Sequence, residues 1–246
     1  MTTLYSFCSQ VLCPDGDQPT GALVQTNGDF YGTTSYGGAH GSYAGTVFKI
    51  TPNGILTTLY SFCHIVGCAD GRQPYAGLIQ GTDGDFYGTT SVGGANSEGT
   101  VFEITPTGML TTLHSFDGTD GGDPVAALVQ DTNGMFYGTT VSGGGVGDGT
   151  VFSLSVALGP FVETDPISGN VGAAVNILGT DLTGATKVTF HGIAATFIAV
   201  SNSEITTTVP TGAIAQRRKR CSGAPCVWPE ACGRSIRSGA RRRCFV

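Results

Sequence analysis

The sequence is poor in charged residues, in tryptophan and in long apolar runs. Only 12% of its 246 residues are charged, and it has a single tryptophan. No stretch of 18 apolar residues occurs, so the sequence predicts no transmembrane segment. Before residue 217, three basic residues face 17 acidic ones. An acidic body of this kind repels nucleic acid and anionic membranes, so we expect no nucleic-acid partner.

A cleavable signal sequence is also missing from the N-terminus. The opening residues MTTLYSF align with LTTLYSF at Leu56 and with LTTLHSF at Leu110. The chain therefore begins inside a repeat. We interpret it as a piece of a longer protein whose signal and anchor are absent from this fragment.

Glycine, by contrast, is abundant, with 39 residues, and Thr, Val, Phe and Tyr recur in short runs. Such runs favour β-strands, and such glycines favour tight turns. The composition therefore predicts an all-β protein.

Three tandem units occupy residues 1–156, at about 1–54, 55–108 and 109–156. Each contains, in order, TTL.SF, a loop with Asp-Gly and Pro, an apolar run such as ALVQ, then FYGTT, Gly-Gly and GTVF. Each unit thus offers four short strands. Asn-Gly or Asp-Gly predicts a two-residue hairpin before FYGTT, and TPNG and TPTG turns join GTVF to the next TTL strand. These short connections predict an antiparallel meander.

Four-stranded units of about 50 residues are typical of propeller blades, of which a ring usually has about 4 to 8. Three units are too few for a ring. We therefore predict a partial β-propeller-like array, which is part of a longer array or is completed to a ring by homo-oligomerisation. A β-trefoil, which also uses three four-stranded repeats, is the alternative.

The FYGTT motif occurs unchanged in all three units. A catalytic residue would be needed once, whereas packing against a neighbouring unit is needed in every unit, so we interpret the motif as structural. Its glycine indicates a place where another backbone passes close. The structural residues predicted from this motif are Tyr31, Gly32, Tyr87, Gly88, Tyr137 and Gly138.

Two of the units contain a pair of cysteines, and the third has lost both together with four loop residues. This paired presence and absence predicts disulfides between Cys8 and Cys13 and between Cys63 and Cys68. Metal binding by the two pairs is the alternative. Disulfides imply an oxidising compartment, so we expect an extracellular or cell-surface protein.

The second unit carries a family resemblance in its segment DGRQPYAGLIQGTDGDFYGTTSVGGANSEGTVFEITPTGMLTTLHSF. This segment resembles the GloVer tandem repeat of the "choice-of-anchor" bacterial surface proteins, and the resemblance covers residues 1 to about 156. It implies an exported, cell-surface or secreted repeat protein with an exchangeable C-terminal anchor. It implies no particular biochemical activity.

The pattern changes in residues 157–213. Pro166 to Ala213 resembles an IPT/TIG domain, a small immunoglobulin-like sandwich, with strands expected at Val175–Leu178 and Val188–Phe190. Such domains serve as spacers or interaction modules. The closing strands of such a domain have no counterpart in the residues that follow, so we expect an incomplete sandwich with an exposed edge.

Residues 214–246 form a basic, Cys-rich tail with almost no strand pattern. We interpret this tail as disordered or as the product of a shifted reading frame. The alternative is a functional tail whose RRKR and RRR runs bind nucleic acid or an anionic surface.

Enzyme signatures are few. No G-x-S-x-G, H-E-x-x-H or P-loop motif occurs. The four histidines are scattered, at His40, His64, His114 and His191. Acid pairs recur in turns, as Asp15 with Asp17, Asp83 with Asp85, and Asp120 with Asp123. We interpret these acids as turn-forming, with weak Ca²⁺ binding as the alternative, and we expect no other cofactor.

We therefore expect a non-enzymatic exported repeat protein that acts as an adhesion, binding or structural module. Glycans or surface proteins are its expected partners, and no catalytic or metal site is expected. The alternative is an extracellular enzyme, active on polysaccharides or other hydrolysable substrates, that uses the turn carboxylates.

Overall fold

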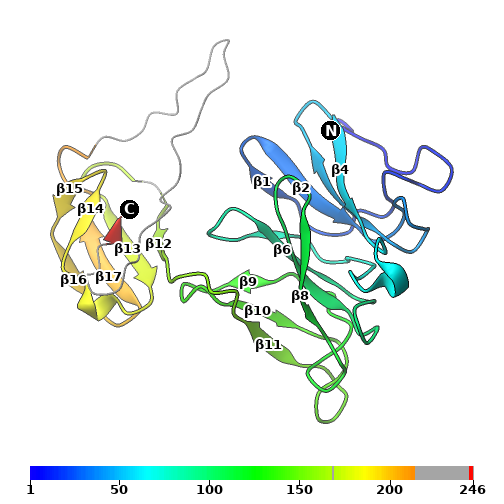
Figure 1. Ribbon diagram of the computed structural model, residues 1–246. Helices are drawn as coiled ribbons and strands as arrows, with labels where there is room; N and C mark the ends of the chain where they lie inside the picture. Colours follow the sequence, from blue (N-terminus) through cyan, green and yellow to red (C-terminus); the bar gives the residue numbers. More distant parts are fainter. Residues whose placement is uncertain (168, 214–243, 246) are drawn as a thin grey trace. The chain divides into compact units, whose positions relative to one another are not determined.

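The computed structural model describes residues 1–167, 169–213 and 244–245, and short strands dominate it (Figure 1). The chain divides into two compact units. The N-terminal unit comprises Met1–Asp131 and Met135–Leu158, and the C-terminal unit comprises Thr132–Gly134 and Gly159–Val246. The all-β prediction is confirmed.

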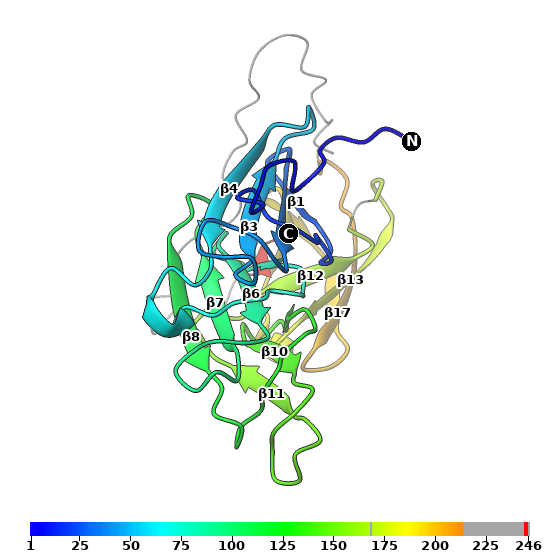
Figure 2. The ribbon, with the colours of Figure 1, turned by 90° about the vertical axis from the view of Figure 1, so that its right-hand side faces the viewer.

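The N-terminal unit contains three antiparallel meander sheets, which follow one another in Figure 2. The first is β1 (Val24–Thr26), β2 (Asp29–Thr34), β3 (Thr46–Ile50) and β4 (Leu56–Ser61). The second is β5 (Ile79–Gln80), β6 (Phe86–Thr90), β7 (Thr100–Ile104) and β8 (Leu110–Ser115). The third is β9 (Val129–Gln130), β10 (Phe136–Thr139) and β11 (Val151–Leu154). Separate sheets, rather than one shared barrel, make this a partial propeller-like array and not the alternative β-trefoil.

Each sheet is offset by one strand from the sequence unit. β4 begins the second unit, yet it pairs with β3 of the first, with Thr46 opposite Ser61, and β8 pairs with β7 in the same way. Among the described residues the three sheets have four, four and three strands, and the sequence units have three, four and four. The prediction of four strands per unit holds for the second and third units and is wrong for the first. Thr2–Phe7, the counterpart of β4 and β8, is not a strand.

The hairpins that precede FYGTT are of two kinds. Between β1 and β2, Asn27 and Gly28 form the predicted two-residue turn, with φ angles of 52° and 89°. Between β5 and β6 the turn is longer, because Gly81 N–H donates to the carbonyl oxygen of Asp85 at 2.8 Å. The two-residue prediction is wrong there, since the second unit has one residue more than the first at this place.

Apolar side chains hold neighbouring sheets together in two clusters. One joins the first and second sheets, and the other joins the second and third. The buried members of the first cluster are Tyr31, Val47, Phe62, Leu78, Phe86, Phe102 and Ile104. Those of the second are Tyr87, Val101, Phe116, Leu128 and Phe136. The core of this unit therefore lies between sheets.

The C-terminal unit has two sheets. One has the order β12 (Val162–Asp165), β13 (Ala174–Gly179), β17 (Glu204–Thr208), β16 (Phe197–Ala199), and the other β15 (Ile193–Ala195), β14 (Val188–Phe190), β18 (Cys244–Phe245). Both contribute to one core, since Ile177 of β13 and Val188 of β14 are completely buried in the same cluster. Both strands expected in this segment are present. The predictions for the tail fall outside the described residues, apart from β18, which runs parallel to β14.

Candidate functional site

The meander topology places two different sets of connections at the two ends of the sheets. We call one end the loop end, where the β2–β3 type of loop and the sheet-to-sheet connections lie: residues 8–22, 35–45, 62–78, 91–99, 116–128 and 140–150. The other is the hairpin end, with residues 27–28, 51–55, 81–85 and 105–109. The loop end includes both cysteine pairs and two of the four histidines, His40 and His64.

One aspartate in each unit fixes the start of a sheet-to-sheet connection. Asp70 is completely buried. Its carboxylate accepts hydrogen bonds from the Tyr60 hydroxyl at 2.8 Å, from the His64 N–H at 3.0 Å and from the Ile65 N–H at 3.2 Å. Burial raises the pKa of Tyr60, and so does this hydrogen bond. The phenol therefore stays a neutral donor.

The sister units repeat this arrangement. The Tyr5 hydroxyl donates to Asp15 at 2.8 Å, and the His114 ring lies 2.6 Å from Asp120. Both aspartates also accept a hydrogen bond from loop backbone, Asp15 from the Cys8 N–H at 3.2 Å and Asp120 from the Asp117 N–H at 3.0 Å. Asp15 and Asp120 therefore serve as turn-forming residues.

Both predicted disulfides are present in the structure, Cys8–Cys13 and Cys63–Cys68. The second closes a loop that contains a short 3-10 helix, η1 (Val66–Cys68). The loops hold aliphatic side chains out in solvent, with Val11 90% and Val66 97% exposed. In the third unit Asp117 replaces the disulfide, and its carboxylate accepts hydrogen bonds from the N–H and hydroxyl of Thr119 at 2.8 and 2.6 Å.

The FYGTT motif packs one sheet against the next. The Tyr31 ring stacks on Phe86 with a centroid distance of 4.3 Å, and Tyr87 stacks on Phe136 at 4.2 Å. Each Tyr thus meets the Phe of the following motif, which is the repeated packing that the identity of the units predicts. Tyr137 holds the same position in the third motif.

The glycine of the motif accommodates a side chain rather than the predicted backbone. A Cβ at Gly88 would lie 2.7 Å from the ring of Phe102 and 3.0 Å from Leu78. Gly32 and Gly138 lie in the same way beneath Phe48 and Phe152. The sequence could indicate a close approach at this position but not what approaches.

Three tyrosines gather at the loop end between the first two sheets. The Tyr36 and Tyr75 hydroxyls lie 2.6 Å apart, and this hydrogen bond is the main cause that raises the pKa of Tyr75 to about 12. The Tyr43 ring lies edge-on to Tyr36 at 5.8 Å and is 65% exposed. Tyr43 comes from a Gly-Gly loop that is two residues longer than its counterparts in the other units. We call these residues the tyrosine cluster.

Three acidic residues meet at the hairpin end of the second sheet. Asp83, Asp85 and Glu103 each place a carboxylate oxygen within 4.8 Å of the other two. The Tyr87 hydroxyl donates to Asp83 at 2.8 Å. Burial raises the pKa of Glu103, as do its hydrogen bond with Asp85 and the charges of both aspartates.

This acidic trio has no counterpart in the other units. Lys49 stands where the second unit has Glu103, and its ammonium group lies 3.5 Å from Asp29. In the third unit Ser153 holds that position. Of the acid pairs interpreted from the sequence, only Asp83 with Asp85 belongs to such a group among the described residues.

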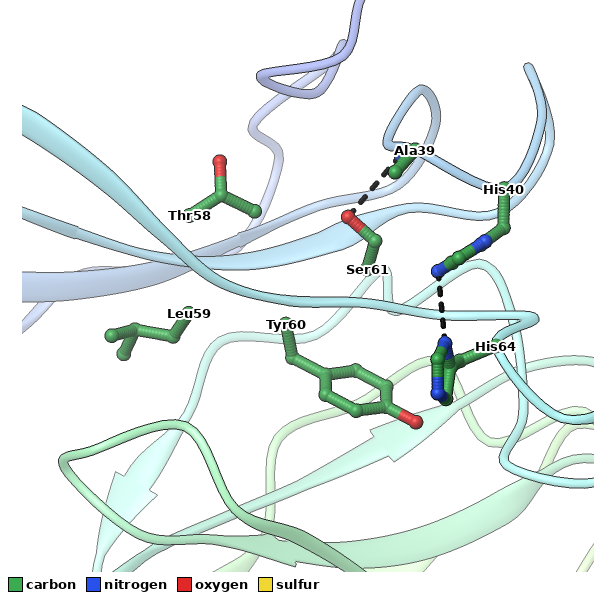
Figure 3. Close-up of a pocket in the computed structure, with 7 residues that line it drawn as sticks. All are labelled: Ala39, His40, Thr58, Leu59, Tyr60, Ser61 and His64. Carbon is green, nitrogen blue, oxygen red and sulfur yellow. Dashed lines mark hydrogen bonds between the residues drawn. The ribbon is translucent and has the colours of Figure 1, made fainter.

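The histidines His40 and His64, scattered in the sequence, meet at an open pocket of about 280 Å³ (Figure 3). His40 Nε2 lies 3.2 Å from His64 Nδ1. Thr58, Leu59, Tyr60, Ser61 and Ala39 complete the lining. The sequence missed this pair because the two residues belong to different units, 24 positions apart; the departure of both positions from the repeat pattern was the available signal.

The structure also bears on membrane association and on relatives. No helix within the described ranges is long and apolar enough to cross a membrane. No curated protein matches the chain. A solved structure provisionally described as a gluconolactonase matches 79% of this chain and 62% of its own, with 13% identity and a TM-score of 0.33. The chain thus spans less than two thirds of that protein. With so low an identity and TM-score, the match supports no statement about the function of this chain.

One family model matches, and its description is the Gloeobacter/Verrucomicrobia repeat. The match runs over residues 63–205, which is more than half of the chain. It begins in the second unit, whereas the resemblance in the sequence was placed at residues 1 to about 156, and it extends into the C-terminal unit. The chain belongs to the Gloeobacter/Verrucomicrobia repeat family.

Proposed function

We propose that this protein is an exported, non-enzymatic binding module whose loop end recognises glycans or surface proteins. The observation that carries the proposal is the tyrosine cluster. Tyrosine combines a large apolar ring with a polar hydroxyl, which makes it frequent at recognition surfaces. Here Tyr43 is mostly exposed, and the hydroxyls of Tyr36 and Tyr75 are joined by a hydrogen bond.

The repeats themselves support a binding role for this cluster. The second unit has Val92 where the first has Tyr36, and the third has Val125 where the second has Tyr75. The repeat therefore folds with an aliphatic residue at either position. Because folding does not require these tyrosines, they are available to bind a ligand.

The proposed location and assembly follow from other features. Two disulfides support an oxidising, extracellular or cell-surface environment. The C-terminal unit, with its two sheets around one core, supports an IPT/TIG-type immunoglobulin-like sandwich that acts as a spacer or interaction module. Association of copies into a ring is part of the proposal.

A glycan microarray tests the binding function. We expect the intact chain to bind a defined set of glycans, and Tyr36→Val, Tyr75→Val and Tyr43→Ser to weaken that binding by about tenfold or more each, with melting temperatures close to the parent. Absence of binding to glycans and to cell-surface proteins alike would contradict the proposal.

Polysaccharide hydrolysis is the second candidate, and the acidic trio is the observation in its favour. Carboxylates within a few ångströms of each other, one with a raised pKa, are the groups that glycoside hydrolysis uses. Measurement of reducing sugar released from the same glycans separates the two functions. Release that is abolished by Asp85→Asn but kept in Tyr43→Ser would favour the hydrolase.

A further inference from the structure

The imidazoles of His40 and His64 are arranged as a pair of ligands. His40 Nε2 and His64 Nδ1 face each other at 3.2 Å, and the ring planes are tilted by 57° (Figure 3). Zinc lies about 2.0–2.1 Å from an imidazole nitrogen, so two such nitrogens on one tetrahedral ion are separated by roughly 3 Å. The observed separation fits a shared ion as well as it fits a hydrogen bond between the rings.

The backbones that carry both rings are fixed. The His64 N–H donates to the buried Asp70, and the disulfide from Cys63 to Cys68 closes the same loop. Beside His40, the Ala39 N–H donates to the Ser61 hydroxyl at 3.2 Å. These contacts restrain the backbone at or beside both histidines before any ligand arrives, which reduces the entropy lost on binding.

Folding of the repeat does not explain the two histidines. His40 corresponds to Asn96 in the second unit and to Val146 in the third. His64 corresponds to Ser9 and Gly118. Asn96 instead donates its side-chain amide to the Phe116 carbonyl at 3.2 Å. The equivalent loops thus form without imidazoles. Both positions are histidine only where the first sheet meets the second.

Water and ions have access to the pair. Both histidines are exposed, and they lie at the edge of an open pocket of about 280 Å³. Tyr60 lines the same pocket, but its hydroxyl donates to Asp70 and is not a metal ligand. An ion on the two imidazoles would keep its remaining positions for water or for a ligand from solution.

We propose that His40 and His64 together bind one divalent transition-metal ion of the kind that prefers imidazole, such as Cu²⁺, Ni²⁺ or Zn²⁺. The metal joins the Gly-Gly loop of the first unit to the disulfide loop of the second. This site is separate from the acidic trio and does not depend on the proposed glycan binding.

Copper titration of the intact, oxidised chain tests the proposal, with all remaining thiols alkylated so that they cannot compete. We expect one Cu²⁺ per chain by calorimetry, and an electron paramagnetic resonance spectrum with splitting from imidazole nitrogen. His40→Asn and His64→Ser place the residues of the sister units at these positions, and each lowers the affinity by about tenfold or more.

His114→Tyr is the matched control, since the sister units have tyrosine there, and it leaves the affinity unchanged. Unchanged melting temperatures of the metal-free variants exclude misfolding as the cause of a loss. Equal copper binding by the parent and by the His40→Asn/His64→Ser double variant overturns the proposal. A loss in only one of the two single variants overturns it too, because the ion would then not be shared.

Discussion

Gly88 lies in the middle of β6, directly beneath the ring of Phe102. Both residues are buried, and a methyl group at Gly88 would come within 2.7 Å of that ring. We therefore expect Gly88→Ala to lower the free energy of unfolding by roughly 1–3 kcal/mol, the usual cost of overpacking a core. Urea unfolding followed by circular dichroism measures the change.

Gly145→Ala provides the control for this substitution, because nothing lies within 4 Å of the added methyl group there. It should leave the unfolding midpoint almost unchanged. Equal midpoints for Gly88→Ala and Gly145→Ala would contradict the structural interpretation of FYGTT.

The raised pKa of Glu103 predicts that the stability of the fold depends on pH. Its pKa is raised in the folded state, so the folded chain binds this proton more tightly than the unfolded chain does. The free energy of unfolding therefore falls as pH rises from the ordinary glutamate pKa, about 4.3, through the raised folded-state value, and stays lower at neutral pH. We expect Glu103→Gln to raise the melting temperature at pH 7 and to change it little at pH 4.

Lys49→Gln gives the matched comparison, since it removes the equivalent residue of the first sheet together with its ion pair to Asp29. This ion pair is half-buried at the surface, where such pairs contribute about 0–1 kcal/mol, so this variant should melt slightly lower at pH 7. A lower melting temperature for Glu103→Gln at pH 7 would show that the acidic trio stabilises the fold instead.

At the level of residues, the sequence predicted roles that recur and missed those that occur once. FYGTT and the cysteine pairs could be interpreted because sister units provide an internal comparison. His40 and His64 contact each other only because a Gly-Gly loop and a disulfide loop of different units meet. The contact between these loops depends on how the sheets pack against each other, and a local sequence pattern does not predict that packing.

The disulfide loop of the second unit is an element that the third unit replaces with a shorter one. There Asp117 accepts hydrogen bonds from Thr119, so the chain turns without a covalent link. We expect a chain in which residues 63–69, CHIVGCA, are replaced by DGT from residues 117–119 to fold with the same β-sheet content. Because the replaced loop has no disulfide, reductant should not lower the melting temperature of this chain through that loop.

Both chains need the first disulfide removed for this comparison, by Cys8→Ser and Cys13→Ser. Cys221, Cys226, Cys232 and Cys244 are also changed to serine in both chains, so that reductant acts at one place. In the chain that keeps Cys63 and Cys68, a loop this small contributes about 2 kcal/mol, and reduction should lower its melting temperature. Equal melting temperatures with and without reductant in that chain would mean that the disulfide does not stabilise the fold.

At the level of elements, the sequence located most strands but not the boundaries of the sheets. A repeat can be divided at any point of its period, so the sequence alone could not show that β4 closes the sheet of the preceding unit. The turn before β6 differs from the one before β2 because of one extra residue, Gly81. A three-residue hairpin loop usually ends in a residue with positive φ, commonly glycine. Gly84, with a φ of 95°, has this role here.

Across the whole N-terminal unit, the third sheet lacks the outer strand that β4 and β8 provide in the other two sheets, so β11 is its outer strand among the described residues. Thr2–Phe7 has the sequence of the strand that fills this place in the other two sheets. Phe7 already packs on Phe48 at 5.0 Å, as Phe62 packs on Phe102 at 5.2 Å. The segment therefore lies where the outer strand of a preceding sheet would lie.

These positions predict that Thr2–Phe7 of one copy pairs with β11 of another. Two copies would place six sheets around a ring, within the usual range of about 4 to 8. Light scattering should give about twice the chain mass of 25.2 kDa, independent of concentration. If the rotation between copies does not close a ring, the same head-to-tail contact continues into filaments and the mass rises with concentration.

Replacing Thr2 and Thr3 by proline tests whether backbone pairing holds the copies together. Both residues are exposed and lie outside any strand, so the single chain should fold as before. Proline cannot donate to a neighbouring strand, and the double variant should therefore have the mass of one chain. The same positions changed to serine keep both N–H groups and should remain dimeric. A proline variant that stays dimeric would place the contact elsewhere, and a monomeric parent would mean that three sheets are stable without closure.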